Sequence, residues 1–452
     1  MKTNEDSYFC LSFNILLNMT FERIIPKDFK AITNVFSSLR SRNYRLYFTG
    51  QGVSLIGTWM QNIALSWLVY RLTGSVFLLG LIGFTSLIPT FVLAPFTGVL
   101  TDRYNKLHIM IIAQVLFMLQ ALIMAFLVLF NLIDVWHIIA LSLVFGIITA
   151  FDAPARQSLV VELIDKPEDL GNAIALNSAI FNGARLIGPA IAGITIAAVG
   201  EGICFLLNAL SFVAVIWALL IIKVPAKQPT INSTNFSESF KEGFQYTFKS
   251  VPIRTLIILL ASLSLFGLSY TVLLPAYAKE ILLGGSDTLG YMMSAMGAGA
   301  LFGAIYMAAR QTVLGLGRII TGSTGVMGLA IVMASFSEKT PFSLVVFFFG
   351  GLSMILLLSS VNTMLQTIAE EDKRGRVMSF YAMALMGTTP IGNLITGTVA
   401  SGIGIRHTLE IIGTITIFSA IWFGLNLKTL RQYIRPIYIT KGILPVLPTD
   451  IV

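Results

Sequence analysis

The sequence predicts an all-α membrane protein whose twelve transmembrane helices form two six-helix repeats. Three observations lead to this prediction. The 452-residue chain is 56% hydrophobic and only 12% charged, whereas charged residues make up about 25% of a typical soluble domain. The apolar residues fall into twelve runs of the length that spans a bilayer. Four glycines recur 204 positions later in the chain: Gly171, Gly183, Gly188 and Gly193 correspond to Gly375, Gly387, Gly392 and Gly397.

The twelve apolar runs are continuous and do not alternate at every second residue. They therefore indicate helices and not the strands of a barrel. The offset of 204 residues places the fifth run on the eleventh, which is the same rank in each half, as parallel repeats require. The runs lie at 46–70, 76–100, 108–130, 135–155, 172–199, 202–222, 255–278, 289–309, 319–336, 342–365, 377–403 and 409–427.

The longest polar interval of the chain joins the two halves. Within it, 236–249 has the pattern of an amphipathic surface helix. We expect a tail at 1–45, a six-helix bundle at 46–222, a linker at 223–253, a second bundle at 254–430 and a tail at 431–452.

Basic residues are distributed unevenly between the two sides of the expected bundle. Of the 30 lysines and arginines, 25 fall in the tails and in the loops after helices 2, 4, 6, 8 and 10, and four fall in the opposite loops. The positive-inside rule then places both termini in the cytoplasm, with the chain in the inner membrane of a bacterial cell. The net charge of +8 therefore faces anionic membrane lipids and does not indicate nucleic-acid binding.

The sequence lacks the common signatures of catalysis. It contains no HExxH, Walker loop, GxSxG or CxxC motif, so a hydrolase or an ATPase is disfavoured. Its two cysteines, Cys10 and Cys204, offer neither a disulfide framework nor a metal site. We therefore expect no enzymatic activity, no cofactor and no metal.

The loop between the second and third runs carries a recognisable motif. Residues 98–103 read GVLTDR and resemble motif A of the major facilitator superfamily, G-x-L-x-D-R-x-G-R-K. Gly98 permits close helix approach, and Asp102 can cap the N-terminus of a facing helix. The resemblance makes Gly98, Asp102 and Arg103 gating residues.

The same resemblance implies partners for Asp102. In the family these are the start of helix 11, here 375–377, and an arginine at the end of helix 4, for which Arg156 is the candidate. Asn105 and Leu107 depart from the motif, which predicts a different bend in this loop.

The fifth run carries a second motif. Residues 184–193 read ARLIGPAIAG and resemble the antiporter motif G-x-x-x-G-P-x-x-G-G, with alanine at two glycine positions. Gly188 and Gly193 allow backbone-to-backbone packing, and Pro189 weakens the helix where it bends. Ordinary small-residue packing explains the glycines, but not their position in the fifth helix. The resemblance implies export.

A longer stretch supports this assignment. The run from 151 to 193, together with RGRVMSFYAMALMG at the start of the eleventh helix, is similar to the facilitator branch that holds the enterobactin exporter and macrolide efflux proteins. The resemblance extends over most of 38–430. It implies a secondary active exporter and does not identify the cargo.

Arg185 is the most informative single residue. It lies 13 positions beyond Asn172, about 20 Å along a helix, and so near mid-membrane, where an ionised side chain costs at least ~2.5 kcal/mol. No carboxylate stands at a matching depth in the helices expected to face it. We expect Arg185 to bind an anionic or electron-rich cargo; the alternative is a structural ion pair with Asp152 or hydrogen bonds to carbonyls.

Proton coupling is implied by the resemblance and has two candidate residues. Asp152 and Glu162 stand near the cytoplasmic end of helix 4. Asp152 and Arg156 are four positions apart, however, and can simply pair with each other.

Polar side chains within the apolar runs are candidates for lining a cargo cavity. They are Gln51, Gln61 and Asn62 in helix 1 and Asn362 in helix 10. Polar packing between helices explains these side chains equally well.

These observations predict a monomeric exporter that moves a small amphiphilic molecule, siderophore-like and anionic or polar aromatic, by alternating access. The expected partners are this substrate, protons and membrane lipids. A multidrug or macrolide efflux pump is the first alternative. A receptor or scaffold without transport is the second, but it would need a large extramembrane domain that the sequence lacks.

Overall fold

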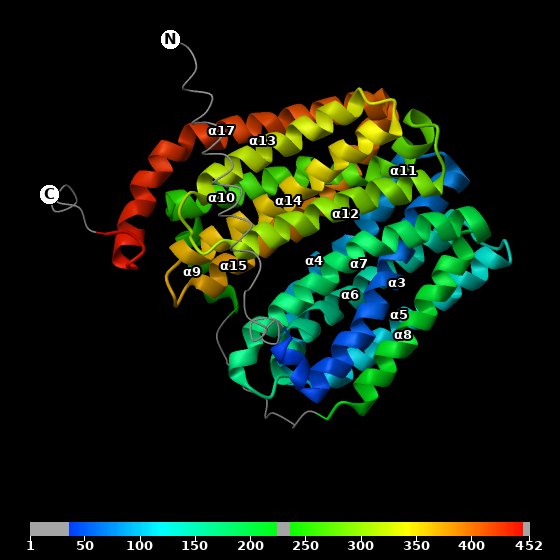
Figure 1. Ribbon diagram of the computed structural model, residues 1–452, viewed down its shortest axis with the longest axis horizontal. Coiled ribbons are helices and arrows are strands. Elements are labelled where there is room, and N and C mark those ends of the chain that lie inside the picture. Colours follow the sequence, from blue (N-terminus) through cyan, green and yellow to red (C-terminus); the bar gives the residue numbers. More distant parts are fainter. Residues whose placement is uncertain (1–35, 224–235, 446–452) are drawn as a thin grey trace, which may run out of the picture.

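The computed structural model describes residues 36–223 and 236–445; the remaining parts of the predicted tails and linker lie outside the described residues. Two helical bundles lie side by side and carry the predicted halves (Figure 1). The first half contains α3 (Arg42–Thr73), α4 (Val76–Arg103), α5 (Lys106–Leu129), α6 (Val135–Glu162), α7 (Leu170–Val199) and α8 (Glu201–Ile221), with short 3-10 turns at Ser37–Arg40 and Pro167–Asp169.

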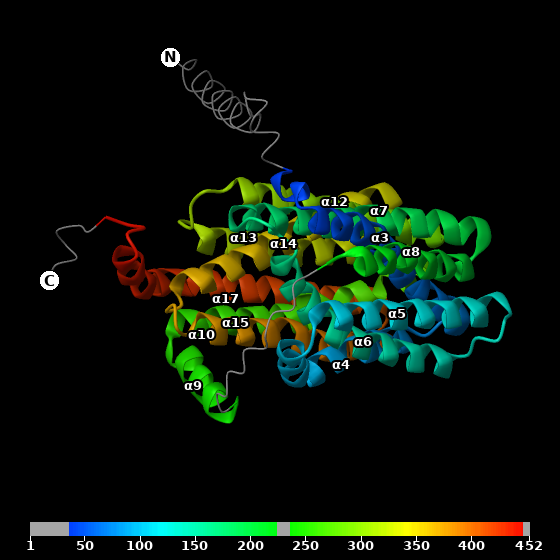
Figure 2. The same cartoon turned by 90° about the horizontal axis from the view of Figure 1, so that it is seen from below.

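The second half repeats this order. Its first rod is α10 (Val251–Ser262), continued by turns to α11 (Leu274–Ala276) and onward to Ile281, and its fifth is α15 (Arg374–Ala382) followed by α16 (Thr388–Ile403). The others are α12 (Ser286–Ala309), α13 (Leu316–Ser335), α14 (Thr340–Ile368) and α17 (Ile405–Thr440). The prediction of a linker helix at 236–249 is confirmed by α9 (Phe236–Lys249), which projects from the bundle below α10 and α15 (Figure 2).

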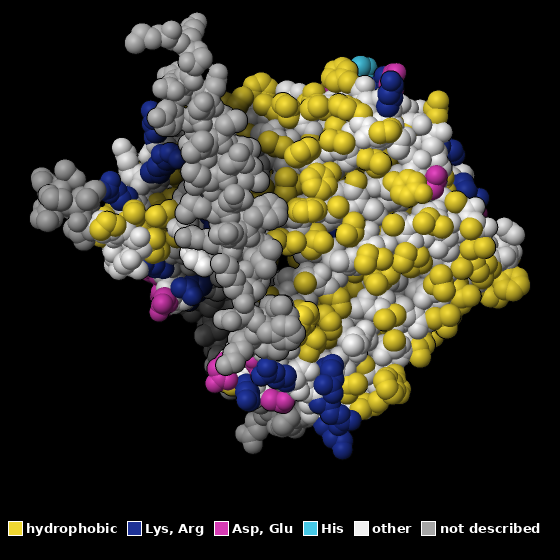
Figure 3. All heavy atoms as spheres, viewed as in Figure 1, with side chains coloured by type: hydrophobic (Ala, Val, Ile, Leu, Met, Phe, Trp, Pro, Cys, Tyr) yellow, Lys and Arg dark blue, Asp and Glu magenta, His cyan; other side chains and the backbone are white. Residues whose placement is uncertain are grey.

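Of the rods described, ten are long and apolar enough to cross a membrane. The remaining two, α3 and the rod Arg374–Ile403, carry more polar residues but occupy the first and eleventh positions of the same bundle. A broad apolar surface between charged ends, as a bilayer requires, is visible in Figure 3. The fold is therefore the predicted all-α membrane bundle of two six-helix repeats.

Helices 7 and 11 are not the uninterrupted helices that the apolar runs predict. Leu263–Gly267 and Met383–Gly387 are π-helical turns. Ser264 lies in the first of these turns and donates a hydrogen bond of 2.6 Å to the Leu385 carbonyl in the second. The interruptions therefore face each other, and such turns often mark functional positions.

The loop that departs from motif A has a local explanation. Asn105, which stands where the motif has glycine, caps α5: its side-chain oxygen accepts hydrogen bonds from the backbone of Leu107 at 2.9 Å and of His108 at 3.4 Å. A helix begins more readily after such a cap. Asn105 therefore starts α5 two residues after α4 ends, and a bend different from that of the family stays a prediction.

We call the end of the bundle where the described chain begins and ends the termini end, and the opposite end the far end. The halves approach each other at the far end and spread apart toward the termini end (Figure 1). The approach runs along two seams, one between α7 and α12 and one between α4 and α16.

Glycines allow the backbones to touch along both seams. A Cβ on Gly193 would lie 3.1 Å from the Gly290 Cα, and a Cβ on Gly397 would lie 2.8 Å from the Gly80 Cα. The second seam is the counterpart of the first, because Gly397 is the repeat equivalent of Gly193. The hydroxyl of Ser286 also donates a hydrogen bond of 3.2 Å to the Gly193 carbonyl.

A latch closes the far end beside these seams. Tyr70, at the end of α3, donates a hydrogen bond to the Glu280 carboxylate, and the Lys279 ammonium lies 5.6 Å from the centre of the Tyr70 ring. Glu280 and Lys279 belong to the turn Tyr277–Ile281 at the end of the first rod of the second half. The latch therefore joins the two halves.

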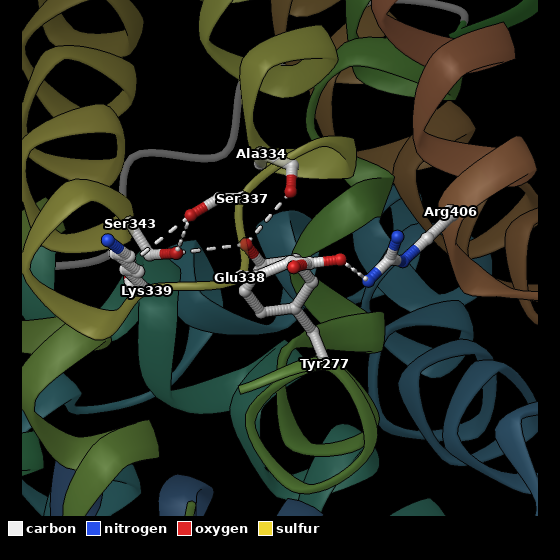
Figure 4. A network of polar contacts seen from close by, with 7 residues as sticks. All are labelled: Tyr277, Ala334, Ser337, Glu338, Lys339, Ser343 and Arg406. Atoms are coloured by element: carbon white, nitrogen blue, oxygen red, sulfur yellow. Dashed lines mark hydrogen bonds and ion pairs between the residues drawn. The ribbon is translucent and has the colours of Figure 1, made fainter. Parts of the chain in front are cut away.

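Tyr277 holds this turn in place. Its hydroxyl donates to the Ala334 carbonyl at 2.9 Å and lies 3.0 Å from the Ser343 hydroxyl (Figure 4). An ion pair of 3.0 Å between Arg406 and Glu338 closes the same corner. These contacts hold in place the turn that carries Glu280.

We predict that Gly193→Ala opens the far end, because its methyl group would lie 2.8 Å from the Ser286 carbonyl oxygen. Spin labels at Leu132 and Leu283, exposed at the far end of each half, would then show a longer or broader distance distribution. Gly183→Ala is the control on the same helix, since its Cβ would meet nothing within 4 Å. Equal distributions for Gly193→Ala and the unsubstituted protein would contradict a tight seam.

Candidate functional site

Arg185 lies midway along α7, at the seam between the halves. Its guanidinium carbon stands 5.6 Å from the centre of the Trp59 ring on α3, a cation–π distance. One terminal nitrogen lies 3.6 Å from the Met354 sulfur on α14. The arginine of the first half therefore reaches the second half at mid-bundle.

Aromatic and sulfur-containing side chains surround this contact. Phe181 packs edge-on against Trp59 with ring centres 5.9 Å apart. Tyr270 is near enough to interact electrostatically with Arg185, and its hydroxyl donates to the Met296 sulfur at 3.2 Å. We call Trp59, Phe181, Arg185, Tyr270, Met296 and Met354 the central cage.

The central cage contains one cation, the Arg185 guanidinium, and none of its other members carries a negative charge. In the described part of the chain, no aspartate or glutamate forms an ion pair with Arg185, and its Nε is buried without a hydrogen-bond partner. Asp152, the alternative partner that the sequence offered, pairs with Arg156 and accepts a hydrogen bond of 2.7 Å from Gln114. The structure therefore gives Arg185 no structural ion pair.

The other predicted binding residues lie in three different settings. Gln51 is buried, and its side-chain oxygen has no partner among the described atoms. Asn62 is exposed, three residues beyond Trp59 on the same face of α3. Asn362 is half-buried and accepts a hydrogen bond from Gln366 in its own helix. Only Asn62 lies one helical turn from a member of the central cage.

Gln61, next to Asn62, belongs to the packing of the first half. Its amide donates to Gln120 at 3.0 Å and accepts from Asn208 at 2.7 Å, and Ser211 donates to the Asn208 side chain at 3.1 Å. This network links α3, α5 and α8. It is the polar packing between helices that the sequence left open as an alternative.

The glycines of the fifth helix have distinct contacts. A Cβ on Gly188 would lie 2.6 Å from the Trp59 Cβ, so this glycine lets α7 pack against α3 beside the central cage. Its repeat equivalent, Gly392, packs in the same way against the Leu265 carbonyl of the second half. Gly193 forms the seam, and Pro189, whose carbonyl oxygen would be 2.6 Å from a Cβ on Gly290, lies between the two contacts.

The structure describes the backbone of motif A but not all of its side chains. Its residues end α4, and Arg103 is exposed; the contacts of Gly98 and the side chain of Asp102 lie outside the described atoms. Arg156, the expected partner of Asp102, is occupied by Asp152. α4 packs along α16, nearer the far end, and the start of helix 11 packs on α9 and α14 instead. A Cβ on Gly375 would meet nothing within 4 Å.

The two candidate protonation sites differ in burial. The Asp152 side chain is 1% exposed, and the buried Tyr47 hydroxyl and Gln114 oxygen nearby have no hydrogen-bond partner in the described chain. Glu162 pairs with Lys106 at 2.6 Å near the surface. Asp152 therefore lies in a buried polar cluster, whereas Glu162 forms an ordinary ion pair.

The second-half members of the central cage were not predicted from the sequence. Met296, Met354 and Tyr270 all lie in apolar runs, where nothing distinguishes them from packing residues. In the structure Tyr270 follows closely on Gly267, where the helix departs from α geometry, but the apolar run gave no sign of this interruption. Nothing in the sequence indicated that these residues face Arg185.

This arrangement of two repeats around a central arginine can be compared with known proteins. A family model described as transmembrane secretion effector matches residues 33–433. The chain belongs to this family. It is accordingly a multi-pass bacterial membrane transporter of the major facilitator superfamily.

The relatives are transporters and efflux proteins. A staphyloferrin A transporter of Staphylococcus aureus is 26% identical, with 85% of this chain and 96% of the relative covered. The multidrug efflux pump Tap of Mycolicibacterium fortuitum is 23% identical, with 80% and 92% covered. Macrolide efflux protein A of Streptococcus pyogenes is 22% identical, with 84% and 95% covered.

Solved structures share the fold. A POT family transporter in complex with 5-aminolevulinic acid has a TM-score of 0.70 at 11% identity, covering 86% of this chain and 97% of that one. The nucleoside transporter NupG has a TM-score of 0.69 at 11% identity, covering 84% and 99%. At these identities the likeness supports the fold alone.

We predict that Arg185→Met leaves the thermal unfolding midpoint unchanged or raises it, because removing an unpaired cation from mid-membrane removes a cost of at least ~2.5 kcal/mol. Arg156→Met should lower the midpoint clearly, since breaking a buried ion pair costs about 3 kcal/mol or more. Thermal unfolding of both purified variants in one detergent gives the comparison. Equal destabilisation would mean that Arg185 has a structural role.

Proposed function

We propose that this transporter exports a small amphiphilic molecule that is anionic or polar aromatic, as a siderophore is. The observation that supports this most directly is the unpaired Arg185 guanidinium at mid-bundle, between the two halves. An ionised side chain at this depth is costly unless a ligand or a partner compensates for it. A cargo that brings a negative charge would supply the missing partner.

The rest of the central cage suits an aromatic cargo. Trp59 is only partly buried and offers a ring face for stacking on an aromatic cargo beside Arg185. Met354, which is partly exposed, provides flexible, polarisable surface that adapts to different shapes. A catecholate, which has a negative oxygen on an aromatic ring, would use both kinds of contact.

The closed far end supports alternating access. The glycine seams and the Tyr70–Glu280 latch join the halves there, so cargo would reach the central cage from the termini end. The excess of basic residues at that end favours a cytoplasmic location for both termini. The described conformation would thus be the one that accepts cargo from the cytoplasm, and the antiporter motif favours export.

A macrolide or multidrug efflux pump is the second candidate. The observation that favours it is the number of aromatic and methionine side chains in the central cage, since apolar, adaptable sites accept varied ligands. Two of the relatives are efflux proteins of these kinds. The two candidates differ in whether Arg185 is needed for the cargo.

Proton coupling belongs to this proposal. Asp152 is the better candidate, because it is buried and has unpartnered polar atoms nearby that a water molecule could connect. Its partner Arg156 is the cation that cargo or proton binding would have to release from it. We propose that the transporter works as a monomer, with each half acting as one rocking unit.

We predict that Arg185→Ala weakens catecholate transport without weakening macrolide transport. Loss of one charge-assisted interaction of about 2 kcal/mol raises the half-saturating concentration about 30-fold. Uptake of an iron-free catecholate siderophore and of erythromycin into inverted membrane vesicles gives the measurement, and Arg185→Lys should retain part of the catecholate transport. Equal loss for both cargoes would contradict the anionic assignment. Transport of erythromycin alone would favour the second candidate.

We predict that Asp152→Asn abolishes proton movement that is driven by cargo while cargo exchange persists. The reason is that asparagine can keep the hydrogen bond to Gln114 but cannot exchange a proton. The measurement uses proteoliposomes with a pH-sensitive dye inside, and Glu162→Gln is the control with the other candidate carboxylate. Normal proton movement in Asp152→Asn would reduce Asp152 to a structural partner of Arg156.

A further inference from the structure

A hollow lies at the termini end of the second half, far from the central cage. It has a volume of about 270 Å³ and lies between the start of α13 and the end of α17. Its floor is apolar, with Leu427, Leu430 and Ile434 among the residues that line it. Three arginines line it too, Arg318, Arg431 and Arg435, and no carboxylate does.

Two of these arginines are available for a ligand. Arg318 and Arg431 are exposed, and within the described chain neither forms an ion pair or a side-chain hydrogen bond. The neighbouring Arg310 differs, because its guanidinium donates to the Thr312 carbonyl at 2.9 Å and to the Leu314 carbonyl. Arg310 therefore shapes the loop that forms one wall, while Arg318 and Arg431 line the hollow without such a partner among the described residues.

The end of α17 has the pattern of a helix at a membrane surface. The sequence predicts that helix 12 ends at 427, but α17 continues to Thr440 and is 36 residues long. That corresponds to about 54 Å, whereas the hydrocarbon core is about 30 Å thick. The last turns therefore lie at the level of the lipid headgroups.

Apolar and basic residues form adjacent rows along these last turns. Leu430, Ile434 and Tyr438 are buried at a helical spacing of four. Arg431 and Arg435 follow them with the same spacing. Such a segment binds where apolar surface and anionic headgroups meet. This pattern is independent of the hollow and lies along its edge.

We propose that this hollow binds an anionic phospholipid of the leaflet at the termini end. Arg318 and Arg431 contact the phosphate of the headgroup, and the acyl chains lie against Leu427, Leu430 and Ile434. The charge of the arginines favours an anion, and the apolar floor favours a lipid over a free anion. The site ties α13 to α17 and does not depend on the cargo proposed for the central cage.

The proposal is tested by lipid binding to the purified full chain in detergent. Phosphatidylglycerol, phosphatidylcholine and inorganic phosphate are the probes, and bound lipid is measured by native mass spectrometry during titration. We expect tight binding of phosphatidylglycerol only. Each arginine near an anionic headgroup contributes about 1 kcal/mol, so R318Q/R431Q should bind phosphatidylglycerol about 30-fold more weakly and each single variant about fivefold more weakly.

Two further variants test whether the binding depends on positive charge and on its position in the hollow. R318K/R431K keeps both charges and should bind phosphatidylglycerol nearly as tightly as the unsubstituted protein. Lys428→Gln removes an exposed charge from the same helix outside the hollow and should leave binding unchanged. Equal binding of phosphatidylglycerol by R318Q/R431Q and the unsubstituted protein would overturn the proposal. Displacement of the lipid by inorganic phosphate, or equal binding of phosphatidylcholine, would overturn it as well.

Discussion

The close backbone contact between the two halves is the constraint on which the rest of this structure depends. In a bilayer, lipid tails are as apolar as leucine, so helices associate through close packing and not through exclusion of water. Gly193 against Gly290, and Gly397 against Gly80, bring backbones to a distance at which dispersion forces are strong. Because these contacts lie from mid-bundle to the far end, the halves close there and spread toward the termini.

The seams also fix the environment of Arg185. The same helix that carries Gly193 carries this arginine about two turns earlier, so the packing of α7 on α12 aims the guanidinium at Met354. Two buried carboxylates of the first half are engaged elsewhere, since Asp152 pairs with Arg156 and Glu201 with Arg71. The cation thus lies at the boundary between the two halves, where no described carboxylate pairs with it.

The membrane surface imposes a different chemistry on the same chain. At mid-bundle one unpaired cation is costly and specific, whereas at the termini end many cations are tolerated because water and anionic headgroups compensate for them. In the hollow, an apolar floor like that of the bilayer core lies next to two arginines, Arg318 and Arg431, of the kind found at the membrane surface. A lipid bound there would stabilise the second half as a unit while leaving the seams free to open.

The sequence by itself determined the fold class, the number of helices and the repeat, since each depends on hydropathy or spacing. It also singled out Arg185 as a candidate, because an ionised residue at mid-membrane is costly. It could not decide which face a helix presents, because these helices are apolar on nearly all sides and carry little amphipathic signal. For this reason Gln61 looked like a cavity residue and proved to be packing, whereas Tyr270 was overlooked. Whether Asp152 pairs with Arg156 or with Arg185, and how the far end closes, were likewise decided only by the tertiary structure, because contacts between distant segments depend on how whole helices pack.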